Sequence, residues 1–100
     1  ERDTSIVISG YELRQNHPNP FIRQTTISYA IPDPGFVRIV IYNSAGQVVR
    51  AFSKKTAHIG EFSVVWDGRD NAGKAVASGV YFYSLETPET RIFRQLVKMN

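Results

Sequence analysis

Few side chains in this sequence could do chemistry, and their spacing does not form a catalytic group. The two histidines, His17 and His58, each lack a second histidine or a carboxylate at the spacing of a metal site. The chain has no cysteine, which excludes thiol catalysis, thiolate metal sites and disulfides. No serine stands in the glycine-x-serine-x-glycine context of a nucleophile. We therefore expect no enzymatic activity and no cofactor.

One cluster of oxygen-bearing side chains resembles a calcium loop in composition. Asp67, Asp70 and Asn71 precede a glycine at position 73. A calcium loop needs ligands at alternate positions and a later bidentate glutamate, and Arg69 and Lys74 interrupt that pattern. The sequence favours turn capping by these side chains and predicts no metal site.

Aromatic residues make up 12% of the chain, which raises the alternative of a sugar-stacking surface. Trp66 shares its strand face with Phe62 and Val64, so its ring is expected in the core. Tyr42 and Phe36 are better candidates for exposed rings, but two such rings do not identify a ligand. An accessory carbohydrate-binding module therefore stays an alternative.

Length and charge narrow the class of protein further. One hundred residues fit a single domain. The net charge of +3 comes from scattered basic residues, so no nucleic-acid partner is expected. No apolar run is long enough to cross a bilayer, and the chain does not start like a signal peptide. If the protein is exported, we expect this chain to be a fragment of a longer precursor.

Alternation of apolar and polar residues predicts an all-β domain. The expected strands cover residues 25–31, 36–42, 47–52, 61–66, 80–86 and 91–99, and residues 4–9 could add a seventh. The inward rows give an expected core of Ile27, Tyr29, Ile39, Ile41, Phe62, Val64 and Trp66. Residues 1–10 are interpreted as a linker or first edge strand, and residues 11–100 as a single antiparallel immunoglobulin-like β-sandwich of about seven strands. A small closed barrel is the alternative architecture.

Two of these strands have an ambiguous inward face. In residues 80–86 either Tyr81, Tyr83 and Leu85 or Val80 and Phe82 could face the core, and the sequence leaves this open. In the last strand we expect Phe93, Val97 and Met99 to face inward. Arg94 and Lys98 would then form a basic outward face.

The connections between strands carry clear turn signals. Asn43-Ser44-Ala45-Gly46 and Asp70-Asn71-Ala72-Gly73 share an Asx side chain and a glycine three residues later, which predicts two tight reversals. Pro18-Asn19-Pro20-Phe21 cannot form a central strand, because two prolines remove backbone donors. We expect a rigid turn there, with Phe21 closing one end of the sandwich.

Taken together, these motifs resemble a known family over residues 11–99. The matching segments are, in order, Tyr11-Glu12-Leu13, Gln15-Asn16-His17-Pro18-Asn19-Pro20-Phe21, Thr25-Thr26-Ile27-Ser28-Tyr29, Ile41-Tyr42-Asn43, Gly46-Gln47-Val48-Val49, Trp66-Asp67-Gly68-Arg69-Asp70, Gly73 and Gly79-Val80-Tyr81-Phe82-Tyr83. The sequence resembles the type A C-terminal sorting domain of the type IX secretion system, which is related to the immunoglobulin-like domain of flagellar hook-capping proteins. It departs from the family at His17, where tyrosine is frequent, and at Ile22-Arg23, where asparagine-proline is frequent.

The resemblance implies a role in protein transport rather than catalysis. The domain would direct an upstream cargo of the same precursor, from a Bacteroidetes-like bacterium, through the periplasm to the cell surface or medium. Its partners would be the outer-membrane translocon and the shuttle proteins of the type IX machinery. The last strand could dock by strand addition. The candidate recognition residues are Pro18, Asn19, Pro20, Phe21, Gly46, Gly79, Arg94 and Lys98. A structural or assembly module of the hook-capping kind, without sorting activity, is the main alternative.

Overall fold

The computed structural model describes residues 10–99, and within this range the chain forms seven strands. They are β1 (Glu12–Leu13), β2 (Thr25–Ile31), β3 (Gly35–Tyr42), β4 (Val48–Thr56), β5 (Gly60–Trp66), β6 (Gly79–Glu86) and β7 (Arg91–Lys98). The expected linker or first edge strand at residues 1–10, including residues 4–9, lies outside the described residues apart from Gly10. Within them, no segment is a helix long and apolar enough to cross a membrane.

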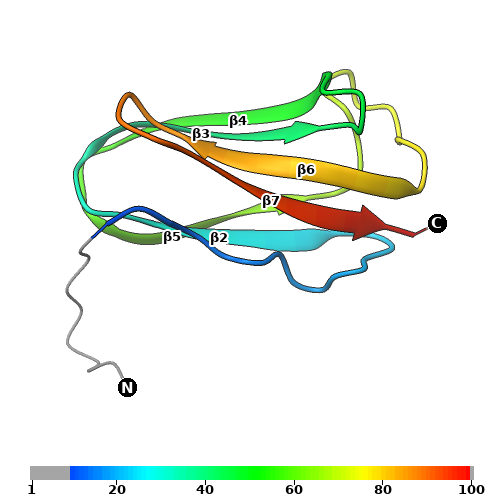
Figure 1. Cartoon of the computed structure of the whole chain (residues 1–100), viewed down its shortest axis with the longest axis horizontal. Helices are drawn as coiled ribbons and strands as arrows, with labels where there is room; N and C mark the ends of the chain where they lie inside the picture. Colours follow the sequence, from blue (N-terminus) through cyan, green and yellow to red (C-terminus); the bar gives the residue numbers. More distant parts are fainter. Residues whose placement is uncertain (1–9, 100) are drawn as a thin grey trace.

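The strands form two separate antiparallel sheets that pack face to face. One sheet has the order β1-β2-β5 and the other has the order β4-β3-β6-β7. Figure 1 shows the four-stranded sheet lying above β2 and β5, with the loops that follow β3 and β5 at the same end as the C-terminus. This arrangement confirms the expected immunoglobulin-like sandwich and excludes the closed barrel.

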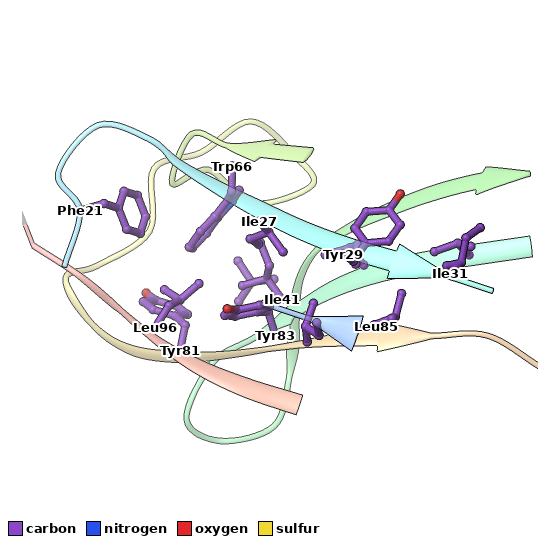
Figure 2. Close-up of a cluster of buried hydrophobic side chains, with 14 residues drawn as sticks. Phe21, Ile27, Tyr29, Ile31, Ile41, Trp66, Tyr81, Tyr83, Leu85 and Leu96 are labelled. Carbon is purple, nitrogen blue, oxygen red and sulfur yellow. The ribbon is translucent and has the colours of Figure 1, made fainter. Parts of the chain in front are cut away.

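The largest side chain of the core is the indole of Trp66, which is fully buried. The rings of Phe21 and Tyr81 both pack near it, with centroids 5.4 Å and 5.6 Å away (Figure 2). Aromatic rings at these distances and inclinations attract one another beyond the area they bury. Phe21, which belongs to no strand, therefore closes one end of the core.

The expected core residues fall into two groups by burial. Ile27, Tyr29, Ile39 and Ile41 are buried together with Trp66. Phe62 and Val64 are only half-buried and pack against the core from β5, which is an edge strand of its sheet. An edge strand has a neighbour on one side only, so its inward side chains keep some contact with water.

The register between β6 and β7 shows which residues of each strand face the core. It decides the open question for β6 and contradicts the expectation for β7. Tyr81, Tyr83 and Leu85 point inward from β6. Residues directly opposite each other share a face, and these three pair with Leu96, Arg94 and Ile92.

The expectation that Phe93, Val97 and Met99 face the core is therefore wrong. Leu96 is fully buried, whereas Phe93 and Met99 are each 50% exposed. Arg94 and Lys98 lie on the inward row, and β7 is an edge strand, so their long side chains can still reach water at the side of the sandwich.

The two predicted reversals have the same hydrogen-bond pattern. In the β3–β4 turn, the Gly46 N–H donates to the Asn43 carbonyl at 2.9 Å, and the Asn43 side chain accepts two backbone N–H groups. In the loop after β5, Gly73 and Asp70 make the equivalent contacts. Both glycines have φ near +85°, at 84° and 86°, a value that other residues rarely adopt.

Candidate recognition surface

The connection between β1 and β2, residues 14–24, is ordered by buried polar side chains and is called the proline loop here. Asn16 and Thr25 are both buried. The Asn16 amide donates to Thr25 Oγ1 at 3.0 Å and to the Pro18 carbonyl at 3.3 Å, and Thr25 Oγ1 donates to the same carbonyl at 2.8 Å. The peptide bonds before Pro18 and Pro20 are both cis. The side-chain hydrogen bonds fix the loop as a rigid turn against the start of β2.

A tyrosine from β6 ties the proline loop to the opposite sheet. The Tyr83 hydroxyl donates to the Arg14 carbonyl at 2.6 Å and accepts from the Asn16 N–H at 2.8 Å. Burial raises the pKa of this hydroxyl, and the opposing effects of the Asn16 N–H and the Arg94 charge do not cancel it. Tyr83 therefore stays neutral and can keep donating to the carbonyl.

The proline loop covers the C-terminal half of the outer edge of β7. The Phe21 N–H donates to the Val97 carbonyl at 3.1 Å, and the Met99 N–H donates to the Phe21 carbonyl at 2.7 Å. The Asn19 side chain accepts the Val97 N–H at 2.9 Å. Phe21 and Lys98 are thus joined by a parallel bridge. The loop supplies backbone partners that this edge would otherwise lack.

The expectation of a free last strand therefore needs correction. The Gln95 carbonyl, also on the outer edge, accepts a hydrogen bond from the Gln15 side chain at 2.8 Å. By strand alternation the backbone groups of Arg91 and Phe93 also face this edge, as does the Gln95 N–H, and no partner for them is found among residues 10–99. Strand addition to β7 is restricted to its N-terminal half.

The structure distributes the eight candidate recognition residues over two regions. Pro18, Asn19 and Pro20 are exposed, whereas Phe21 is buried as the end plug of the core. Gly79 pairs with Lys98 at the end of β7, next to the proline loop. Arg94 lies further along β7, where its Nε donates to the Leu13 carbonyl and joins the two sheets.

Gly46 is not part of that group. It lies in the β3–β4 turn and lines a hollow of about 350 Å³ on the outer face of the four-stranded sheet. Phe82 and Phe93, which are 37% and 50% exposed, line the same hollow together with Tyr42 and Arg91. Sequence alternation predicts Phe93 in the core, so it does not reveal this aromatic surface. Recognising it required the register between β6 and β7.

A partly buried carboxylate organises the polar side of that outer face. Glu86 accepts hydrogen bonds from the Tyr42 hydroxyl at 2.5 Å and from Ser84 Oγ at 2.7 Å. Arg91 and Arg38 approach the same carboxylate at 3.4 and 3.6 Å. Burial disfavours the charged form, but the two hydroxyls and the two arginines outweigh it, so the pKa of Glu86 is lowered.

The polar groups of the loop that begins at Trp66 and Asp67 form hydrogen bonds with one another. The Trp66 indole N–H donates to the Arg69 carbonyl at 2.8 Å, and the Arg69 N–H donates to Asp67 at 3.1 Å. Asp70 accepts the N–H groups of Ala72 and Lys74 at 3.0 and 2.9 Å. The expected capping role of both carboxylates is therefore confirmed. Across residues 10–99, no three acidic or histidine side chains are grouped so as to hold a metal ion.

Comparison with known proteins identifies the family. The model of the FlgD Ig-like domain matches residues 24–90. The chain belongs to this family. A search of curated protein sequences finds no match.

Solved structures show the same fold at low sequence identity. PorU from Porphyromonas gingivalis, solved as a latent dimer, is 20% identical over 89% of this chain with a TM-score of 0.71. PorZ from the same organism, described as an essential surface component of the type-IX secretion system, is 22% identical over 86% with a TM-score of 0.62. The chain spans only 9% and 11% of these two proteins.

A hook-capping protein shares the fold as well. FlgD from Xanthomonas campestris, described as essential for flagellar assembly through hook capping, is 21% identical over 88% of this chain and 64% of its own, with a TM-score of 0.57. At these identities the three structures show the fold alone.

The family match does not extend over either side of the candidate recognition surface, although the FlgD structure from Xanthomonas campestris covers 88% of this chain. The match begins at residue 24, after nearly all of the proline loop, and ends at residue 90, just before β7. The two unmatched segments are the ones that hydrogen-bond to each other through Phe21, Val97 and Met99. They form one continuous surface on the shared domain.

Proposed function

We propose that this FlgD Ig-like domain is a C-terminal sorting domain that directs an upstream cargo through the type IX secretion system to the cell surface or medium. One observation carries the proposal. The proline loop and β7, segments about 80 residues apart in sequence, join as one hydrogen-bonded surface that presents exposed side chains in a fixed arrangement. The shared fold with PorZ, a surface component of that system, supports it.

The proposed role needs recognition and no reaction. Exposed Pro18, Asn19 and Pro20 present a rigid shape beside the end of β7, and Phe21 anchors that shape in the core. A fixed surface is recognised without the entropy cost of ordering it at the moment of binding. The partners would be the outer-membrane translocon and shuttle proteins, met in the periplasm, together with the cargo domain of the same precursor.

An export assay tests the proposal. A reporter with a Sec signal peptide is fused before residues 1–100 and expressed in a type IX competent host and in an isogenic strain lacking the translocon. We expect the reporter on the surface or in the medium of the first strain and in the periplasm of the second. Retention in the periplasm of both strains would contradict the sorting role.

Surface variants separate recognition from folding. Deleting residues 91–100 removes the buried Leu96, so loss of export on deletion could reflect unfolding. The double change of exposed Pro18→Ala and Pro20→Ala leaves Leu96 and Phe21 in place, and its free energy of unfolding is measured alongside because it also alters the turn; Lys54→Gln and Lys55→Gln on the opposite edge strand β4 are the control. Export should fall for the proline variant, with little change for the lysine variant. Equal export of the proline variant and the lysine variant would indicate that the machinery recognises a surface other than the proline loop.

The alternative is a structural or assembly module, and the family match itself favours it. FlgD, which carries this type of domain, is described in flagellar hook capping, a role in assembly and not in the sorting of a cargo. The same export assay decides between the two, because a spacer domain would leave the reporter in the periplasm of both strains. Export of the deletion variant as efficiently as the intact fusion would also favour the spacer.

A further inference from the structure

Beside the proline loop lies a basic hollow, and of its lining residues only Lys98 is among the candidate recognition residues. Its volume is about 340 Å³, and three separate parts of the chain line it. Arg23 comes from the proline loop, Asp67 and Arg69 from the loop after β5, and Lys98 from the end of β7. Three cations and one carboxylate leave a net charge of +2 around this hollow.

The cations of the hollow are available to a ligand. None of the ion pairs found among residues 10–99 involves Arg23, Arg69 or Lys98. One guanidinium nitrogen of Arg69 donates to the Gly73 carbonyl at 3.0 Å, which holds the side chain in place and leaves its other N–H groups free to donate. The Asp67 carboxylate accepts the backbone N–H of Arg69, so the single anion of the hollow already has a partner.

The position of the lysine is set by packing. Gly68 is buried with φ of +75°, and a Cβ atom there would lie 2.7 Å from Lys98 Cε and 3.7 Å from the Phe21 ring. Because Gly68 has no side chain, the stem of Lys98 can pack against its backbone, next to the ring of Phe21. With its stem packed there, Lys98 lines the hollow and loses less freedom on binding than an unpacked lysine would.

We propose that this hollow binds a phosphate monoester group. A monoester carries a charge of about −1.5 to −2 at neutral pH, which matches the net charge of the lining residues. Arginine forks donate two parallel hydrogen bonds to such an oxyanion, and a lysine adds a point charge. The volume accommodates the phosphate together with part of the sugar or lipid that carries it. Binding here is independent of the proposed export role.

The test uses the 100-residue chain and inorganic phosphate. Amide resonances are followed by NMR during a phosphate titration, with sodium chloride at equal ionic strength as the reference. We expect saturable shifts confined to residues around Arg23, Gly68 and Arg69. Shifts that spread over the surface and do not saturate, as in chloride, would overturn the proposal.

Charge variants supply the second arm. Arg23→Gln with Lys98→Met removes two charges and keeps an unbranched stem over Gly68, and each single variant is measured alongside. Phosphate affinity should fall by about tenfold or more in the double variant, because each lost contact is a charge-assisted hydrogen bond. Lys54→Gln with Lys55→Gln removes the same charge on the opposite edge and should change affinity by less than about twofold. Equal affinities in the two double variants would overturn the assignment.

A third arm identifies the source of the phosphate. Glucose 6-phosphate is compared with glucose, and phosphatidic acid vesicles with phosphatidylcholine vesicles. Binding of glucose 6-phosphate that weakens in the double variant would support a phosphorylated sugar. Binding of phosphatidic acid vesicles that weakens in the same way would support a lipid headgroup. Failure of both phosphate forms to bind would overturn a monoester site.

Discussion

The Tyr83 hydroxyl offers the most direct test of how the proline loop is held. Tyr83→Phe deletes one oxygen from a fully buried ring and leaves the packing of the ring itself unchanged. The hydroxyl has two partners, the Arg14 carbonyl at 2.6 Å and the Asn16 N–H at 2.8 Å. The variant therefore leaves a buried donor and a carbonyl without partners.

The expected cost follows from those two contacts. An unpaired buried N–H costs about 1–3 kcal/mol, and the lost bond to the carbonyl adds about 1 kcal/mol. We expect the free energy of unfolding to fall by about 2–4 kcal/mol, a large share of the total for a domain of this size. Tyr81→Phe is the matched control, because its hydroxyl makes a single hydrogen bond, to the Ala77 carbonyl at 2.6 Å.

Urea unfolding followed by the fluorescence of Trp66, the only tryptophan, measures this cost. Amide hydrogen exchange at Asn16 reports locally, and it should accelerate in Tyr83→Phe and not in Tyr81→Phe. A smaller loss of stability in Tyr83→Phe than in the control would refute the reasoning. Unchanged exchange at Asn16 would refute it independently.

Three further outcomes are expected. Phe21→Ala should lower the free energy of unfolding by about 3–5 kcal/mol and shift Trp66 emission to the red, since the two rings lie 5.4 Å apart; unchanged emission would contradict the plug. Although burial opposes its ionisation, the lowered pKa of Glu86 means that its stabilising contribution is complete above the unfolded-state pKa and is lost as pH falls through the lower folded value. Glu86→Gln should therefore flatten the acid side of a stability profile measured by urea unfolding, and an unaltered profile would count against the cluster. Thermal melts in calcium and in chelator should coincide, because Asp67 and Asp70 cap backbone N–H groups; a clear rise in calcium would show a metal site.

Strand faces could be predicted only where one row of side chains is apolar and the other polar. In β2, Ile27 and Tyr29 alternate with Thr26 and Ser28, and the apolar row is the buried one. In β7 both rows carry apolar side chains, so alternation gave the wrong face. The pairing register with β6, a contact between strands, decides the question.

The sequence predicts the segments of the candidate recognition surface and not the way they assemble. Two prolines around Asn19 indicate a rigid turn from local geometry alone. The target of that turn is 78 residues away, where Asn19 accepts the Val97 N–H. No periodicity in the sequence encodes such a pairing, because it depends on how the two sheets close on each other.

The parallel course of the proline loop and β7 gives the domain a direction in which it resists force. Both segments run toward the end that holds the C-terminus (Figure 1), and they are joined by hydrogen bonds at Phe21 and Asn19. Tension between residues 10 and 99 pulls these segments past each other, so the bonds are loaded in shear and must break together. A force applied along the long axis of the domain would therefore have to break these hydrogen bonds, which act as a mechanical clamp, before the sandwich unfolds.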